Sequence, residues 1–253
     1  MITIIGTGHV FDIGQRIRRI IEARAPQAVC VELDPGRYYA LTHSEDKAKA
    51  EKHPDETARQ KEKATFLYRM LGGIQEQIAE QYGAPVGGEM LAAVEAARER
   101  LADVLLIDDN AGQVVQRMWK EMPFMEKARL FFSAFGGMLA KKTTVEKELS
   151  DFQENPESFF SMLEKQMPTI KRVLIDERNE HMATRVREAA QKYLNIAVIV
   201  GDGHVPGMSK LLADLSPEIM RLKELRMDNF AAPSIAGWQG NAGSATVSFY
   251  VEK

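Results

Sequence analysis

The feature that most restricts the fold of this chain is a series of short apolar runs rich in Ile, Val and Leu. Each run is four to six residues long and is bounded by glycine, acidic residues or proline. The runs lie at residues 2–5, 28–33, 104–108 and 196–200. Buried parallel strands have this length and composition. We therefore expect these four segments to form the core strands of one sheet.

Helical patterns occupy the chain between these runs. Ile13, Ile17, Ile20 and Ile21 recur at helical spacing before Pro26, which predicts a β-α-β unit across the first two strands. Two further amphipathic helices precede the third and fourth strands. The first carries Met90, Leu91, Val94, Ala97 and Leu101 on one face, and the second extends from Pro168 to Leu194. Alternating strands and helices predict an α/β fold with a mostly parallel central sheet flanked by helices.

The whole chain, residues 1–253, is predicted to form a single domain, because 253 residues with 45% hydrophobic side chains can bury one sizeable core. Helical insertions between the strands are expected at about 43–83 and 110–166. The role of the tail at 227–253 is open, although its sequence SATVSFYVEK is compatible with an added edge strand.

The second insertion contains the longest mostly apolar stretch, LFFSAFGGMLA at residues 130–140. A transmembrane helix needs about twenty such residues, so we predict a buried or surface-docked helix and no transmembrane segment. Its aromatic residues and those of 159–160 are interpreted as helix-packing core, the alternative being an apolar groove or a membrane-surface contact. They are Phe131, Phe132, Phe135, Phe159 and Phe160, and Met162 is interpreted in the same way. These apolar helices are also compatible with a homodimer.

Charge and cysteine content narrow the class of protein. The formal net charge is −3, which gives no electrostatic reason to expect a nucleic-acid partner. The single cysteine, Cys30, lies in an apolar run, so no intrachain disulfide can form and we expect a buried thiol. The N-terminal sequence has no signal-peptide pattern. A cytoplasmic location is the expectation.

One turn sequence occurs twice. Gly-x-Gly-His-Val follows the first apolar run with His9 and the fourth run with His204. Ligands of open parallel sheets gather at the carboxyl ends of the strands, and glycines there allow close approach to the backbone. Two imidazoles therefore reach the same rim if the two strands are near neighbours. The alternative for each histidine is an ordinary hydrogen-bonded loop residue.

Acidic and basic side chains are expected at the same rim. Glu32 ends the second run, with Asp34 and Arg37 just beyond it, and Asp108 and Asp109 end the third. A carboxylate at the end of an apolar strand needs a cationic partner, a metal or a raised pKa. Two histidines and a carboxylate form the usual ligand set of a hydrolytic metal centre. Alternatively, Glu32 forms an ion pair with Arg37 or Arg178, and Asp108 caps the following helix.

The helix before the fourth strand contributes LIDERNEHMATR, in which Glu177, Arg178 and His181 fall within about one turn. For His181, packing or surface exposure is the simpler interpretation. A nucleotide site is a further alternative, because GTGHVF followed by Glu32 imitates the dinucleotide fingerprint. Phe11 stands where that fingerprint has its third glycine, which weakens this alternative.

Five blocks of the sequence together resemble the TraB/PrgY family, which is linked to the Tiki proteins and to ChaN-like and erythromycin-esterase-like folds. They are GTGHVF, VELDPGRY, RMWKEMPFMEKARL, LIDERNEHMA and VIVGDGHVPGM. In the Tiki branch two Gly-x-x-His motifs, a Glu and an Arg are thought to form a metal-dependent protease site, and PrgY and TraB are associated with the shutdown of peptide pheromones. By motif, the resemblance implies roles for His9, Glu32, His204 and Arg178.

Two departures from the family accompany this resemblance. Asp109 stands where the family usually has an arginine after the third strand. Many microbial members also continue into membrane helices, which this sequence does not include.

The resulting hypothesis is a hydrolase that acts on a peptide or protein substrate. His9, Glu32 and His204 hold Mn²⁺, Co²⁺ or Zn²⁺, Glu177 or Asp34 accepts a proton from water, and Arg178 or Arg37 stabilises the oxyanion. The alternatives are a non-catalytic protein that binds or sequesters peptides in the same cleft without a metal, and a nucleotide-binding protein.

Overall fold

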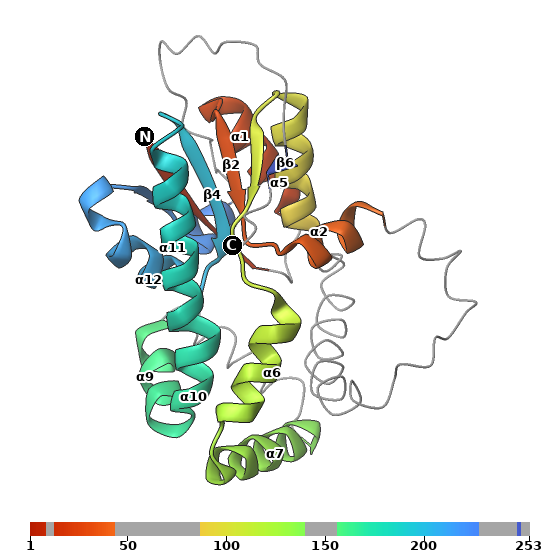
Figure 1. Ribbon diagram of the computed structural model, residues 1–253, viewed down its shortest axis with the longest axis vertical. Helices are drawn as coiled ribbons and strands as arrows, with labels where there is room; N and C mark the ends of the chain where they lie inside the picture. The colour runs from red at the N-terminus through yellow and green to blue at the C-terminus, as the bar shows by residue number, and fades with distance from the viewer. Residues whose placement is uncertain (9–12, 44–86, 140–155, 228–246, 249–253) are drawn as a thin grey trace.

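The computed structural model contains a six-stranded parallel sheet (Figure 1). It describes residues 1–8, 13–43, 87–139, 156–227 and 247–248. The strands are β1 (Ile2–Thr7), β2 (Ala28–Val31), β3 (Asp103–Leu106), β4 (Ile196–Gly201), β5 (Glu218–Met220) and β6 (Val247–Ser248). All four predicted core strands are present, and the predicted α/β fold is confirmed.

The order of the strands in the sheet differs from their order in the sequence. The sheet is arranged β5-β1-β4-β2-β3-β6, so β4 lies between β1 and β2. Ile5 pairs with Ile199 on one side of β4, and Val31 pairs with the same residue on the other side. The predicted β-α-β unit is present, and its two strands are not adjacent: the crossover from β1 to β2 passes over a gap that β4 fills. The two strands that precede the Gly-x-Gly-His turns, β1 and β4, are direct neighbours.

Helices cover both faces of the sheet and form two hydrophobic cores. On one face Ile5, Val29 and Ile199 pack with α1 (Gly14–Arg24), α5 (Gly88–Glu99) and α13 (Leu222–Leu225). On the other face Ile4 and Val198 pack with α11 (Glu177–Ala190) and α12 (Val205–Leu211). Successive strand residues thus point to opposite layers, as the pleat requires. This burial on both faces explains why the strands are continuous apolar runs.

Local sequence explains the ends of the helices on the first face. Ile17, Ile20 and Ile21 are fully buried in α1, which ends where Ala25 adopts a left-handed conformation before Pro26. The periodicity predicted that Leu101 lies on the buried face of α5, but the structure places Leu101 beyond the end of this helix. The helix ends at Glu99, and Leu101 has a positive φ of 56° and an exposed side chain.

The predicted helix at 168–194 is interrupted by a change in winding. It consists of α10 (Pro168–Lys171), a π-helical segment (Arg172–Asp176) and α11. A π-helical turn inserts one extra residue and shifts the side chains that follow it around the helix axis. This turn lies immediately before Glu177 and Arg178.

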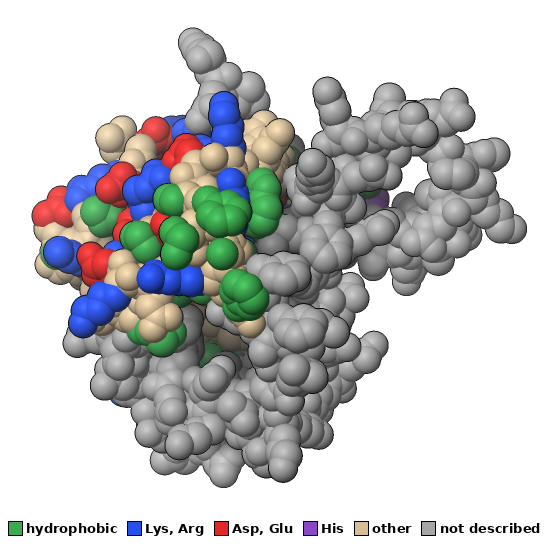
Figure 2. All heavy atoms as spheres, turned by 90° about the horizontal axis from the view of Figure 1, so that it is seen from below, with side chains coloured by type: hydrophobic (Ala, Val, Ile, Leu, Met, Phe, Trp, Pro, Cys, Tyr) green, Lys and Arg blue, Asp and Glu red, His purple; other side chains and the backbone are tan. Residues whose placement is uncertain are grey.

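The insertion after β3 extends beyond the sheet as α6 (Ala111–Glu121), α7 (Phe124–Leu139) and α9 (Pro156–Gln166), which form the lower end of Figure 1. On this end, hydrophobic side chains lie exposed among charged ones (Figure 2). Phe132 is 71% exposed and Met162 is 44% exposed, so the interpretation of these two residues as core is wrong. Among the described helices, none is long and apolar enough to cross a membrane.

Two other predictions concern the first insertion and the tail. The predicted edge strand of the tail is confirmed, because β6 pairs in parallel with β3. Helix α2 (Pro35–Thr42) precedes the predicted first insertion at 43–83, nearly all of which lies in residues 44–86, outside the described part of the chain. Phe131, Phe135 and Phe159 have no described side chains.

Candidate functional site

The carboxyl ends of β2 and β4 bring Glu32 and His204 together. The backbone N–H of Glu32 continues the ladder to Ile199, and the backbone N–H of Gly201 donates to Glu32 Oε2 over 2.6 Å. His204 Nε2 lies 3.5 Å from Glu32 Oε1. Both residues are about 95% buried, at 4% and 5% exposure. A carboxylate and an imidazole thus face each other in a site largely removed from water.

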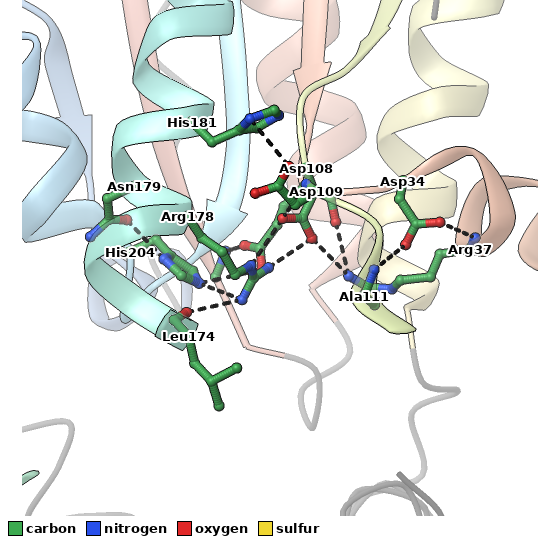
Figure 3. Close-up of polar contacts among 12 residues, drawn as sticks. Asp34, Arg37, Asp108, Asp109, Ala111, Leu174, Arg178, Asn179, His181 and His204 are labelled. Atoms are coloured by element: carbon green, nitrogen blue, oxygen red, sulfur yellow. Dashed lines mark hydrogen bonds and ion pairs between the residues drawn. The ribbon is translucent and has the colours of Figure 1, made fainter. Parts of the chain in front are cut away.

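Arg178, which α11 directs at this rim, connects the groups (Figure 3). Its Nη2 donates to Glu32 Oε1 at 2.6 Å and its Nη1 to His204 Nε2 at 3.1 Å. Its Nε and Nη2 hold both oxygens of Asp108 at 2.9 and 2.7 Å, and Nη1 also reaches the carbonyl of Leu174 at 3.3 Å. A guanidinium has five N–H donors, and these five contacts use all of them.

Charge in this network is closely compensated. Two carboxylates, Glu32 and Asp108, face Arg178 and the half-buried Arg37, whose Nη1 lies 3.4 Å from Asp108 Oδ2. Burial by itself lowers the pKa of Arg178. The charges of Glu32 and Asp108 and the hydrogen bonds to them outweigh burial, so the pKa of Arg178 is raised above its ordinary value. Arg178 therefore remains a cation at any working pH.

The tautomer of His204 follows from its two neighbours. Arginine can only donate, so His204 Nε2 is the acceptor of the Arg178 contact and carries no proton. The proton resides on Nδ1, which donates to Oδ1 of Asn179 over 2.8 Å. This neutral imidazole, fixed through Nδ1 with Nε2 directed into the site, has the arrangement typical of a metal-binding histidine.

A second arginine secures the loop that carries His204. Arg221 Nε and Nη2 bind both oxygens of Asp202 at 2.8 and 2.6 Å, and the backbone N–H of Leu222 adds a bond of 2.9 Å. The same carboxylate packs against Gly6, where an added Cβ would lie 2.3 Å from Asp202 Oδ1. The glycine of β1 is therefore required for the close approach of the His204 loop.

The structure does not bring Glu177 to Glu32 and His204. Glu177 forms surface ion pairs with Arg117, at 2.8 Å, and with Arg172. The carboxylate of Asp34 accepts from the backbone N–H groups of Gly36 and Arg37 at the start of α2. Both residues predicted to accept a proton are thus engaged elsewhere.

The two aspartates of the LLIDDN turn have different partners. Asp108 is not a helix cap, because Asn110 caps α6 by accepting from the backbone N–H of Gln113. The carboxylate of Asp108 belongs to the Arg178 network. Asp109 lies 3.2 Å from His181 Nδ1 (Figure 3). His181 is therefore paired with Asp109 and is neither core nor free surface.

Arg37 lies at the edge of the site. Its Nη1 donates to the main-chain carbonyl of Glu32 at 3.3 Å, while the Glu32 carboxylate is paired with Arg178. Of the two arginines proposed as partners of Glu32, Arg178 is thus the one that contacts its side chain.

His9 lies outside the described residues, two positions after the end of β1 at Thr7. Within the described ranges, no group of three or more His, Cys, Asp or Glu side chains is arranged to hold a metal ion. Of the three predicted metal ligands, Glu32 and His204 lie in the described part of the chain, and the structure brings these two together.

Three residues of the site, Asn179, Asp202 and Arg221, were not predicted from sequence. Asn179 and Asp202 adjoin residues that were predicted, Arg178 and His204, and small polar residues beside a predicted site are a usable signal. Arg221 had no such signal, because its link to Asp202 depends on the position of β5 beside β1.

Comparison with known proteins agrees with the family resemblance of the sequence. The model of the TraB/PrgY/gumN family matches residues 1–218. The chain is 33% identical over 216 residues to Uncharacterized protein MJ1365 of Methanocaldococcus jannaschii, a match that covers 85% of this chain and 54% of that relative. The chain thus spans about half the length of this curated relative. With a family match over most of its residues, the chain belongs to the TraB/PrgY/gumN family.

Proposed function

We propose that this protein is a metal-dependent hydrolase that acts on peptides, with His204, Glu32 and His9 as ligands of Mn²⁺, Co²⁺ or Zn²⁺. The observation that carries the proposal is the 3.5 Å separation of His204 Nε2 and Glu32 Oε1. Two ligands each about 2.1 Å from a tetrahedral metal lie about 3.4 Å apart. The two atoms therefore have the separation of neighbouring ligands.

The chemistry of the donors also fits. A neutral imidazole nitrogen and a carboxylate oxygen suit these metals, and each is oriented by a partner of its own. Asn179 fixes the ring of His204, and the Gly201 N–H fixes the other oxygen of Glu32. A metal bound there lowers the pKa of a coordinated water and polarises a peptide carbonyl.

Arg178 contributes a permanent positive charge next to the two ligands. Its bidentate pair with Asp108 holds the guanidinium in place, so N–H groups that turn from Glu32 or His204 to a substrate can stabilise a developing oxyanion. The choice of peptides as substrates rests on the resemblance to PrgY and TraB, which implies peptide binding or cleavage.

A second candidate function is binding or sequestration of peptides without a metal. It is favoured by the ion pair between Glu32 and Arg178, which satisfies the buried carboxylate without any further cation. The nucleotide alternative has less support, because β4 separates β1 from β2 whereas the dinucleotide fingerprint uses adjacent strands.

The test uses protein purified without a histidine tag. Wild type and a His204→Gln variant are incubated with a defined peptide pool and with each metal or EDTA, and the products are identified by mass spectrometry. We expect metal-dependent cleavage by wild type only. Peptides that bind equally well with EDTA and remain intact would favour sequestration.

A further inference from the structure

We infer that Arg178 is a built-in competitor of the metal: its guanidinium occupies the same two atoms, Glu32 Oε1 and His204 Nε2, that a divalent cation must take. This inference rests on the proposed function and specifies how metal access to that site is controlled. Arg178 lies 2.6 Å from the first atom and 3.1 Å from the second. The arginine thus bridges the proposed ligands as a cation would.

The contacts of Arg178 divide into two groups. Those to Glu32 and His204 engage the ligand atoms and must be given up when a metal binds. Those to Asp108 and to the carbonyl of Leu174 lie outside the ligand pair and can remain. Asp108 is 1% exposed at its side chain, and it accepts from both Nε and Nη2 of Arg178. Asp108 is therefore the anchor that retains the guanidinium when the other contacts break.

The charges of the site explain why competition follows. In the metal-free arrangement Arg178 compensates two buried carboxylates, which have almost no water to stabilise them. A divalent cation next to Glu32 takes over the compensation of that carboxylate and repels the guanidinium. Metal affinity is therefore lower than the ligands alone would give, and metal-free stability is higher. Release of the arginine from Glu32 couples metal binding to the freeing of its N–H donors.

The test compares Arg178→Gln with wild type. Gln removes the charge and keeps a polar side chain. The dissociation constants of Mn²⁺, Co²⁺ and Zn²⁺ are measured by titration calorimetry, and melting temperatures are measured with EDTA and with metal. We expect the variant to bind metal about tenfold more tightly or better, because a like charge a few ångströms away is removed. Its melting temperature in EDTA should fall, while its increase on adding metal should exceed that of wild type.

Arg187→Gln is the matched control. Arg187 lies on the same helix and pairs with Asp214 through two nitrogens at the surface, at 2.8 and 2.6 Å, without contact to Glu32 or His204. It gives the same change in net charge and should leave the metal dissociation constant within about twofold, because exposed charges are screened. If Arg178→Gln does not fold, Arg178→Lys replaces it. Its compact ammonium cannot bridge all the acceptors, so we expect a smaller tightening of the same sign.

The outcomes separate this inference from the function on which it rests. Wild type that binds metal, with Arg178 variants that bind it no more tightly, would overturn the inference alone. Binding by the Arg178 variants but not by wild type would support the inference and refute the proposed function for the natural protein. If none of these proteins binds a divalent metal, both fall.

Discussion

Glu32→Gln probes the site through both oxygens of the carboxylate. Oε1 accepts from Arg178 at 2.6 Å and Oε2 accepts from the backbone N–H of Gly201, also at 2.6 Å. An amide has one acceptor oxygen and one donor NH₂ group. Whichever way the substituted amide is oriented, its NH₂ group faces another donor, so one of the two contacts is lost and replaced by a donor–donor conflict.

The expected cost follows from these two contacts. Loss of a charge-assisted hydrogen bond costs about 1.5–3 kcal/mol, and a buried donor without an acceptor adds about 1 kcal/mol or more. Arg178 keeps its pair with Asp108, so the cost stays at the low end of the range for breaking a buried ion pair. We expect the free energy of unfolding to fall by about 2–4 kcal/mol. For a chain of this size the melting temperature should then fall by about 5–15 °C.

The assay is thermal unfolding followed by circular dichroism, in EDTA and with each metal. Asp34→Asn is the control, because Asp34 is equally buried and its Oδ1 accepts from the backbone N–H groups of Gly36 and Arg37 at a helix start, where Asn is as good a cap as Asp. Of its contacts, only the long one of 3.4 Å between the Ala111 N–H and Oδ2 is lost in this variant. Its cost should stay below about 1 kcal/mol. With metal at about 100 times its dissociation constant, wild type should gain about 2.7 kcal/mol. Glu32→Gln should lose most of that gain.

Because Glu32 is ion-paired with Arg178, the metal-free melting temperature of Glu32→Gln does not distinguish a metal-dependent hydrolase from a metal-free peptide-binding protein. From sequence alone, the metal hypothesis predicts that this variant keeps its metal-free melting temperature, but the contact with Arg178 makes destabilisation the expectation for both functions. The metal-induced increase is therefore the decisive quantity. A variant as stable as wild type in EDTA would refute the contacts themselves. A wild type indifferent to every divalent metal would refute the metal site.

Three further variants or treatments test other parts of the structure. Asn179→Ala removes the acceptor for His204 Nδ1 and should weaken metal binding about 10–100-fold, measured by calorimetry; unchanged affinity would contradict the assigned tautomer. Gly6→Ala forces a Cβ against Asp202, which is held in place by its own bonds, and should cost about 2–3 kcal/mol in urea unfolding. Burial raises the pKa of Cys30 from 9.0 to about 12, so its thiol should not react with Ellman's reagent at pH 8 until the protein unfolds. Because the unfolded thiol releases its proton first, stability from this group is complete below pH 9 and is lost as the pH rises toward 12.

The positions of the helices and strands along the chain are largely predictable from sequence. Which strands pair with one another in the sheet is harder to predict. Strands buried on both faces must be apolar throughout, which is why the four core runs were visible. The position of β4 depends on pairing between Ile5 and Ile199 and between Val31 and Ile199, contacts that span about 170–190 residues. Nothing in the local pattern of either strand specifies a neighbour so distant in sequence.

In the candidate site, too, the sequence indicates which side chains are present but not which of them pair with one another. Glu32 was conspicuous as a carboxylate in an apolar setting, and Arg178 was one of two proposed partners. The choice between Arg178 and Arg37 required the geometry, because both follow predicted elements at the same rim. Glu177 adjoins Arg178 in α11, but successive residues of a helix point about 100° apart, so Glu177 faces Arg117 and Arg172 instead of Glu32.

The central place of β4 has a consequence for how the protein reaches its folded state during synthesis. Until the ribosome has produced residues 196–201, β1 and β2 lack the strand that joins them, and Glu32 has neither the Gly201 amide nor the Arg178 guanidinium beside it. Until then β1 lacks both of its neighbours, β4 and β5, and β2 lacks β4, a state in which exposed strand edges invite pairing with other chains. Completion of the sheet and assembly of the ion-pair network become a single late event, and the long sequence separation of the contacts makes that event slow.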